Sequence, residues 1–388
     1  MTCLPLEIDP VAILQQLVRI DSVNPDLVPG AAGEVEIAAW CGDWLRAQGF
    51  DVSVLERTDG RPSVVGIRRG AGNGRSLMLN AHLDTVGVAT YAGDAFSGDL
   101  RDGRVHGRGA VDTKSGVAAV LVAAARAASF GPAGDVIVTL VSDEEFGSIG
   151  TAEVLGAFRA DAALVIEPSS LELTTAHRGF AWFELELAGL AAHGSQPELG
   201  VDAIWHAGLV LRALDGLRQQ LNAAAPHPTL GHGAVRVSQI VGGDDAATVA
   251  ARCVLTVERR MLPGESPEHV EAELIALFTE LARTDSQFRF TLTRLVARPA
   301  FEAELHWPIV RALTDNADRV LGHPAKTRGE PFWTDAALLL DAGIPCVVFG
   351  ADGQGLHADT EWADAQSVRA LAEILEGTII DFCGPAVG

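Results

Sequence analysis

The chain has 388 residues, of which 48% are hydrophobic and 21% charged, and its formal net charge is -22. This composition is typical of a globular protein long enough to form two domains, each with its own core. The negative charge, which no Lys/Arg-rich run offsets, argues against nucleic acid or an anionic membrane surface as a partner.

Cysteine usage and the first residues of the chain predict a cytoplasmic protein. The 5 cysteines are odd in number and form no C-x-x-C pair, which argues against a disulfide framework or a structural zinc knuckle. The first residues lack a basic segment followed by an apolar one, and the longest apolar stretch, over 116–125, is too short to span a membrane.

The first 177 residues alternate between helical and strand patterns. Amphipathic spacing predicts helices over 11–18 and 34–48, the second ending before Gly49 as a C-cap, and an Ala-rich segment predicts a helix over 116–129. Apolar runs predict strands over 52–55, 64–68, 77–80, 136–142 and 162–166. This alternation predicts an α/β fold with a mostly parallel sheet flanked by helices.

The pattern changes after residue 177 and returns near residue 300. Strands over 180–188, 234–241, 250–259 and 288–295, with helices over 201–221 and 267–283, give a β-α-β-β-α-β series. This predicts a ferredoxin-like α+β domain of residues 178–297, inserted into an α/β domain of residues 1–177 and 298–388. The second part of the α/β domain is predicted to contain helices over 307–320, 334–342 and 364–376 and a strand over 345–349.

Short apolar runs precede side chains that can bind a metal, namely His82, Asp112, Glu145, Glu167 and His357. Because the ends of neighbouring strands in an open parallel sheet meet in one crevice, we expect these side chains to converge on a two-metal site. Each alone has an ordinary explanation as a surface residue or, for Asp112, as a helix N-cap. Nitrogen and oxygen ligands without thiolate suit zinc, with cobalt or manganese as possible substitutes.

Further acidic side chains lie beside these ligands. Asp84 follows His82 by two residues in an extended segment, so its carboxylate can take the free ring N–H while the other nitrogen binds metal. A purely structural His–Asp contact is the alternative. Glu144 and Glu145 are consecutive, so one can bind metal while the other acts as a base in metal-assisted hydrolysis; a solvated turn is the alternative.

The motifs N-A-H-L-D-T (80–85), G-R-G-A-V-D-T-K-S-G (107–116), S-D-E-E-F-G-S (142–148), L-V-I-E-P (164–168) and G-A-D-G-Q-G-L-H-A-D (350–359) resemble those of a known enzyme family. It is the acetylornithine deacetylase, succinyl-diaminopimelate desuccinylase and carboxypeptidase G family of dinuclear zinc hydrolases. The resemblance covers nearly the whole chain, including the inserted domain. It implies one zinc held by His82 and Glu167, a second held by Glu145 and His357, and a bridge between them through Asp112.

The resemblance also implies the roles of neighbouring residues. Asp84 would orient His82, Glu144 would be the general base, and the peptide bond between Asp112 and Thr113 would be cis. The inserted domain would form a homodimer and a lid.

In the inserted domain, His193 in A-A-H-G-S-Q-P-E (191–198) resembles the histidine that the dimer partner supplies to the substrate carbonyl oxygen. Arg260 resembles the arginine that grips the substrate carboxylate, for which a planar fork is well suited. The ordinary explanations are a neutral surface histidine and a salt bridge at a strand end.

Two positions depart from the family pattern and bear on the substrate pocket. The family often has Asn where this chain has Thr248, so a donor on the oxyanion side becomes a hydroxyl or is lost. Many members have Gly-Gly where this chain has Phe332 and Trp333, just before the predicted substrate-binding residues Thr334 and Asp335. We expect the aromatic pair to narrow or reshape the pocket, so no single member's specificity carries over directly.

These features predict a metal-dependent amidohydrolase that cleaves an N-acyl amino acid of the acetylornithine type. A dipeptidase, aminopeptidase or carboxypeptidase of the same family is the first alternative. A requirement for a free α-amino group on the substrate would identify a dipeptidase or an aminopeptidase. A non-catalytic binding protein is the second alternative, although it would not need Glu144. A nicotinamide dehydrogenase is disfavoured because the Gly-rich segment over 70–74 precedes a strand instead of following one.

Overall fold

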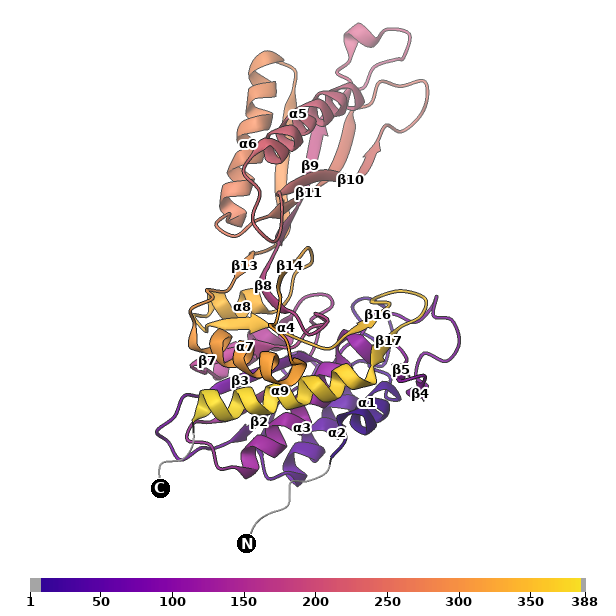
Figure 1. Cartoon of the computed structure of the whole chain (residues 1–388). Coiled ribbons are helices and arrows are strands. Elements are labelled where there is room, and N and C mark those ends of the chain that lie inside the picture. Colours follow the sequence, from indigo (N-terminus) through magenta and orange to yellow (C-terminus); the bar gives the residue numbers. More distant parts are fainter. Residues whose placement is uncertain (1–7, 385–388) are drawn as a thin grey trace. The chain divides into compact units, whose positions relative to one another are not determined.

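The computed structural model describes residues 8–384, which form two compact units (Figure 1). Unit 1 contains the described residues up to Thr175, together with Ala303–Arg328 and those from Thr334 onward. Unit 2 contains Ala176–Glu302 and Gly329–Trp333. The chain therefore leaves unit 1 after its first 175 residues and returns to complete it.

Among the described residues, the largest sheet has nine strands, and its centre is parallel. The parallel strands are β6 (Val136–Val141), β3 (Leu77–His82), β7 (Ala162–Val165) and β15 (Cys346–Val348), in that spatial order. Antiparallel pairings flank them: β1 (Asp51–Leu55) and β2 (Ser63–Arg68) on one side, and β8 (Leu173–His177) with β13 (Phe301–Glu302) on the other. Strand β14 (Thr327–Glu330) also pairs with β8. Every residue of β3 and β6 is buried, as expected for strands covered on both faces. The predicted α/β fold is confirmed.

Helices cover this sheet: α1 (Pro10–Val18), α2 (Val35–Ala47), α3 (Ser115–Ser129), α4 (Ile149–Ala157), α7 (Pro308–Leu321), α8 (Ala336–Asp341) and α9 (Ala365–Cys383). The side chain of Asp9 caps α1 by accepting the N–H of Val11, and Gly49 follows α2 with a φ of 80° as predicted. Helix α3 packs against α1 and α9 (Figure 1). Helix α4 was not predicted, and α9 continues to Cys383, beyond the predicted end at 376.

A second, small sheet joins distant parts of unit 1. Its order is β16 (Gly353–Gln354), β17 (Trp362–Asp364), β5 (Arg104–His106) and β4 (Asp99–Arg101). A π-helical turn, Ala110–Lys114, follows β5 and leads into α3. This sheet brings the segment around residue 357 beside the turn that contains Asp112.

Unit 2 has an antiparallel sheet in the order β10 (Ala234–Gly242), β11 (Arg252–Met261), β9 (Gly179–Ala188) and β12 (Arg289–Arg298). Helices α5 (Ala203–Ala223) and α6 (Pro267–Thr284) supply the core on one face, where Phe183 and Leu185 pack with Phe278. Alternate residues of β9 are buried, because only one face of this sheet is covered. The predicted β-α-β-β-α-β series is confirmed.

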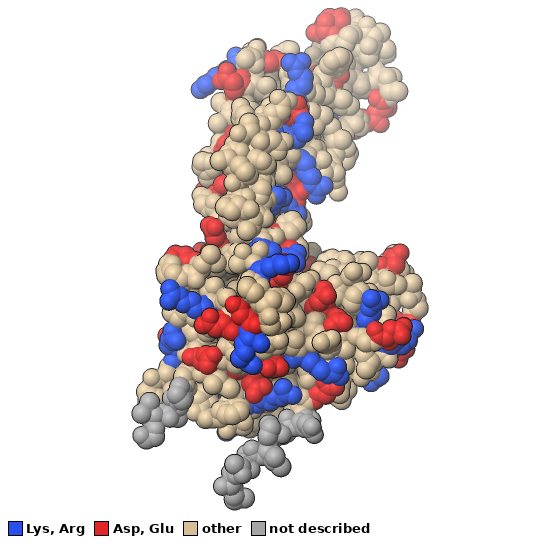
Figure 2. Space-filling view, in the orientation of Figure 1, with Lys and Arg blue, Asp and Glu red and all other residues tan. Residues whose placement is uncertain are grey.

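The surface of unit 1 mixes both signs of charge. On the face shown in Figure 2, acidic and basic side chains are interspersed over this unit. None of the helices in residues 8–384 combines the length and apolar character needed to cross a bilayer.

Candidate metal centre

The structure brings the five predicted ligands together in unit 1, in two groups that share Asp112. One group contains His82, Asp112 and Glu167, and the other contains Asp112, Glu145 and His357; within each group the candidate ligand atoms lie within 4.8 Å of one another. Metal binding by these residues stays a prediction, but their convergence is a property of the fold.

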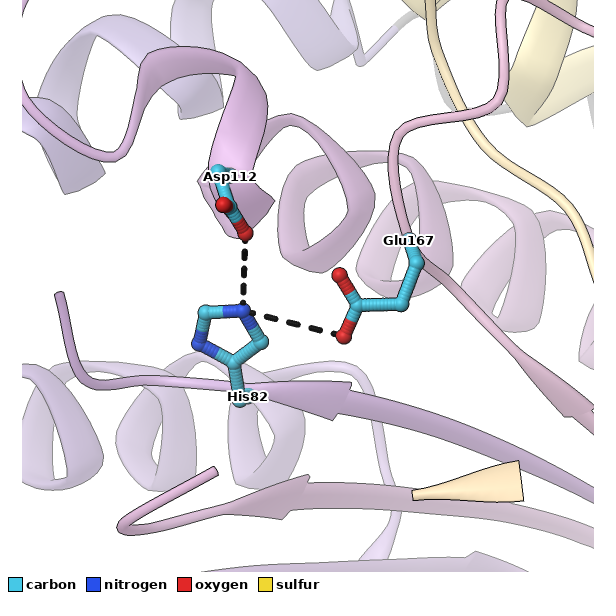
Figure 3. Close-up of side chains that lie close together, drawn as sticks. All are labelled: His82, Asp112 and Glu167. Carbon is cyan, nitrogen blue, oxygen red and sulfur yellow. Dashed lines mark hydrogen bonds and ion pairs between the residues drawn. The ribbon is translucent and has the colours of Figure 1, made fainter. Parts of the chain in front are cut away.

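Asp112 directs its two oxygens at different histidines. Its Oδ1 lies 3.1 Å from Nε2 of His82, which in turn lies 3.7 Å from Oε1 of Glu167 (Figure 3). Its Oδ2 lies 3.4 Å from Nε2 of His357, which lies 3.0 Å from Oε2 of Glu145. A carboxylate placed in this way can bridge two cations, one held by each group.

Two of the five residues lie at the ends of adjacent parallel strands. His82 is the last residue of β3, and Glu167 follows β7 by two residues. Gly350 packs against Glu167, where a Cβ at residue 350 would come within 2.1 Å of the Glu167 carbonyl oxygen. Glycine is therefore required at this position for the chain after β15 to approach the site so closely.

The prediction that each ligand follows the end of a strand is wrong for Asp112 and only approximate for His357. Asp112 lies in the π-helical turn before α3, and its peptide bond to Thr113 is cis, as the resemblance implied. His357 lies between β16 and β17 with a φ of 59°, not directly after a strand of the main sheet. These two side chains reach the centre from irregular segments that the small sheet holds in place.

The orientation of His82 is set by a backbone carbonyl. Nδ1 of His82 lies 2.9 Å from the carbonyl oxygen of Asp84 and 3.6 Å from the carboxylate Oδ1 of the same residue. A carbonyl only accepts, so Nδ1 must carry a proton, and neutral His82 keeps the lone pair on Nε2 for a metal.

The carboxylate of Asp84 binds the turn that carries Glu144 and Glu145, and no sequence pattern predicts these contacts. It accepts the backbone N–H groups of Glu144 at 3.1 Å and Glu145 at 3.2 Å, and the side-chain amide of Asn24 at 2.7 Å. Asp84 therefore fixes the turn that presents both glutamates.

A buried network supports this turn from behind. Arg61 donates to Glu34 through Nε and Nη2, both at 2.8 Å, and to Asp143 at 2.9 Å. Asn24 also donates to Asp143, at 3.0 Å, and Asp143 precedes Glu144 in the chain. No local motif marks this network, since its members are separated by up to 119 residues.

Burial and mutual repulsion dominate the electrostatics of the carboxylates. Burial, followed by repulsion from Asp112, raises the pKa of Glu145 to about 7. Burial and repulsion from Glu167 raise the pKa of Glu144 well above its usual range. Hydrogen bonds to Asp112 and Glu145 raise the pKa of His357 to about 10. Acids crowded in this way are stabilised by a cation.

The geometry fits a pair of divalent cations. Oε1 of Glu145 is buried and has no hydrogen-bond partner, so one acceptor of this ligand residue is left unsatisfied, as expected where a cation binds. Imidazole and carboxylate donors without thiolate are the set that zinc binds in hydrolytic sites.

Thr334 and Asp335 are both buried in unit 1. The hydroxyl of Thr151 donates to Oδ2 of Asp335 at 2.5 Å and receives the side-chain amide of Asn80, in β3, at 3.2 Å. Burial raises the pKa of Asp335 to about 6. The substrate-binding role of Thr334 and Asp335 stays a prediction, and the observed contacts attach Asp335 to the strand that ends in His82.

In unit 2, His193 is exposed and forms an isolated β-bridge with Thr248. The backbone N–H of Ser195 donates to Nδ1 of His193 at 3.2 Å, so the proton of the neutral imidazole lies on Nε2. His193 therefore presents a donor to solvent.

Arg260 lies on the uncovered face of the unit 2 sheet. Its Nη2 lies 2.9 Å from Oε1 of Glu258, and its guanidinium lies 5.4 Å from the ring centre of Phe180. Glu258 also accepts the indole N–H of Trp182 at 3.1 Å and pairs with Arg236. Arg260 therefore forms a salt bridge, as its ordinary explanation expects. About a third of its side chain, 30%, remains exposed.

Comparisons with known proteins agree with this geometry. The model of Peptidase family M20/M25/M40 matches residues 78–381. Acetylornithine deacetylase of Myxococcus xanthus is 29% identical over 96% of this chain and 97% of that protein. N-formyl-4-amino-5-aminomethyl-2-methylpyrimidine deformylase of Bacillus subtilis is 27% identical over 92% of this chain and 91% of that protein. The structure of the Bacillus subtilis YXEP protein, a dinuclear metal binding peptidase, matches with a TM-score of 0.73 and 16% identity over 96% of this chain and 97% of that one.

Proposed function

The chain belongs to peptidase family M20/M25/M40, and from that membership we propose that this amide-cleaving, metal-dependent hydrolase deacylates an N-acyl amino acid of the acetylornithine type. The observation that carries the proposal is the pair of ligand groups joined through Asp112, with Glu144 next to one of the ligands in the chain. A binding protein would have no use for a base at that position.

We assign the two groups to two Zn²⁺ ions, for which Co²⁺ or Mn²⁺ can substitute. His82 and Glu167 would hold one ion, Glu145 and His357 the other, and Asp112 both. The chemistry supplied by two bound cations is Lewis-acid activation of water and of the acyl oxygen.

Glu144 would move the proton in this reaction. It accepts the proton of the attacking water and returns it to the nitrogen of the leaving amine, so that one carboxylate serves as base and then as acid. The two hydrogen bonds of the 144–145 backbone to Asp84 hold Glu144 in place during both transfers.

Arg260 would select the substrate by its carboxylate. A guanidinium presents a planar fork that matches a carboxylate, and Glu258 orients that fork from one side. An N-acyl substrate is favoured over a peptide by two relatives described above, at 29% and 27% identity, of which one is a deacetylase and the other a deformylase. A peptidase activity is the second candidate, because the YXEP protein, which shares the fold, is a peptidase.

Unit 2 would form the homodimer through an apolar patch, which we call the edge patch. It consists of Ile204 and Trp205 on α5 and Ile240 on the edge strand β10, with exposed fractions of 47%, 79% and 51%. Val241, which is 71% exposed, extends it onto the opposite face of the same strand. A Cβ at Gly242 would lie 3.2 Å from Ile204, so the helix and strand parts of the edge patch adjoin. Exposed apolar edges of this kind pair readily with a second copy.

The first experiment measures amine release from a panel of N-acetyl, N-succinyl and N-formyl amino acids and dipeptides. Each assay is run with added zinc or cobalt and again after chelation. Metal-dependent release from N-acyl amino acids is expected. Release only from dipeptides with a free α-amino group would favour the peptidase, and metal-independent release would exclude the proposed chemistry.

A second experiment tests whether His193 acts across the dimer. His193→Ala should lose about 10²–10³ in rate, which is typical for one oxyanion donor, and Glu144→Gln about 10²–10⁴ through loss of the base. If His193 acts in trans, a mixture of the two inactive proteins after subunit exchange should recover roughly a quarter of wild-type turnover. No recovery, despite heterodimers seen by native mass spectrometry, would place His193 in cis or outside the reaction.

A further inference from the structure

Glu361 is a buried carboxylate that sequence patterns did not single out. Its Oε2 accepts Nη1 of Arg108 at 2.8 Å and the backbone N–H of Gly109 at 2.9 Å. Its Oε1 accepts the backbone N–H groups of Val111 and Asp112, both at 3.0 Å. One side chain thus satisfies two donors of the π-helical turn, the N–H of Gly109 just before it and one guanidinium.

Arg108 connects Glu361 to the loop that carries His357. Its Nη2 donates at 2.8 Å to the carbonyl of Ala358, the residue after His357. Its guanidinium lies 5.3 Å from the ring centre of Tyr91, whose hydroxyl donates to the backbone carbonyl of Glu361 at 3.2 Å. Arg108 is 2% exposed and Glu361 is 1% exposed, so this network is shielded from water.

These contacts connect two ligands that come from distant parts of the chain. Asp112 belongs to the turn whose N–H groups Glu361 accepts, and His357 lies four residues before Glu361 on the same loop. Neither segment is regular strand or α-helix, so regular hydrogen bonding does not fix either of them. The small sheet brings the two segments together, and the Glu361–Arg108 pair adds the side-chain contacts that fix one ligand against the other.

We propose that Glu361 is a positioning residue that makes both metal-binding groups assemble together, by fixing the shared ligand Asp112 against the loop of His357. The proposal rests on the proposed two-metal function. Because Asp112 belongs to both groups, loss of Glu361 weakens both binding steps, whereas loss of a ligand that belongs to one group weakens one.

Glu361→Gln tests this with little change in volume. The amide oxygen can still accept the N–H groups of Val111 and Asp112, but the amide NH₂ then faces the donors of Arg108 and Gly109. The turn should remain folded while its link to the His357 loop is lost. Changes in groups that orient metal ligands typically lower metal affinity by about 10–100-fold.

The control and the comparison variant come from the same unit. Glu153→Gln is the matched control, because Glu153 is also buried and accepts a backbone N–H, that of Arg57, at 3.2 Å. Glu167→Gln is the comparison variant, because Glu167 belongs to only one group.

The experiment titrates zinc into each metal-free full-length protein against a competing chelator and records the absorption spectrum of the cobalt forms. Glu361→Gln should lower both stepwise affinities by about 10–100-fold and alter the cobalt spectrum. Glu153→Gln should match wild type, and Glu167→Gln should lower mainly one step. Wild-type affinities and spectrum in Glu361→Gln would overturn the proposal while leaving the metal site standing.

Two further outcomes are informative. A wild-type protein that binds no zinc would overturn the proposed metal site and this proposal with it. If Glu361→Gln does not fold, Arg108→Lys replaces it, since a lysine keeps the charge but cannot contact Glu361 and the Ala358 carbonyl as a fork. Both affinities should again fall, and wild-type values would overturn the proposal.

Discussion

The two units differ in where a functional side chain can be placed. In unit 1, β6 is buried along its whole length, and the acidic residues Glu144 and Glu145 come only after it ends. In unit 2, β9 is buried at alternate residues, so Trp182 and its neighbours on one face remain accessible beside Glu258 and Arg260. A sheet covered on both faces leaves chemistry only at its ends, whereas a sheet covered on one face can present it along the strand.

This difference implies that unit 1 carries the reaction in buried, charged groups that support one another. Unit 2 would then carry recognition, together with the oxyanion donor proposed for His193, in side chains that each act more independently. The predictions below test this division, beginning with the change that should have the largest effect.

Glu144→Gln should lower kcat by about 10²–10⁴, since the variant keeps the shape of the side chain but cannot accept a proton. Zinc content should stay at the wild-type level, because Glu144 belongs to neither ligand group. Steady-state kinetics on the best N-acyl substrate, with metal analysis of the same sample, makes the measurement. Glu184→Gln, on the uncovered face of β9, is the control and should change kcat by no more than about twofold. Activity of Glu144→Gln close to that of the control would remove Glu144 from the mechanism.

Arg61→Met should destabilise the protein by about 3–5 kcal/mol, because it leaves Glu34 and Asp143 buried without their counter-charge. Urea unfolding followed by circular dichroism measures this loss. Turnover should fall as well, since Asp143 precedes the turn that carries Glu144. A loss below about 1 kcal/mol, the range of exposed pairs, would mean that the network is not a unit supported by Arg61.

Most of the fold could be predicted from the sequence, because each long element has a periodicity that its environment imposes. The run over 136–141 has no polar alternation and is a fully buried strand, while Phe183, Leu185 and Leu187 alternate and form the covered face of β9. The small sheet could not be predicted in this way. Strands β16 and β17 have two and three residues, which is too short for any period to be visible.

The sequence predicts those residues of the candidate site that come at or just after the end of a strand. His82 and Glu167 follow adjacent parallel strands, so topology alone brings them together. Arg61 and Glu361 could not be found in the same way, because each acts through partners far along the chain; 249 residues separate Glu361 from Asp112. Such residues have no local motif, and only the folded chain shows what they contact.

Arg260→Lys should raise KM by about tenfold or more with a smaller change in kcat, since lysine cannot offer two parallel N–H donors to a carboxylate. Arg236→Lys is the matched control, because Arg236 contacts the same Glu258 but lies 65% exposed. Its KM should stay near the wild-type value. Equal effects of the two variants on KM would show that Glu258, and not the guanidinium of Arg260, determines recognition.

Arg252→Met should have the smallest effect, although Arg252 and Glu186 are the same residue types as Arg61 and Glu34. Nε and Nη2 of Arg252 lie 2.9 and 2.6 Å from Oε2 of Glu186, but the side chains are 62% and 41% exposed. Water and salt screen such a pair, and either partner left alone is rehydrated, so the urea midpoint should match that of wild type at ordinary ionic strength. If Arg252→Met lost as much stability as Arg61→Met, the geometry of the Arg–Glu contact, and not its burial, would determine the loss of stability in both units. If the two variants differ as expected, burial of the Arg61 network, and not the geometry of the contact, is the cause of its larger contribution to stability.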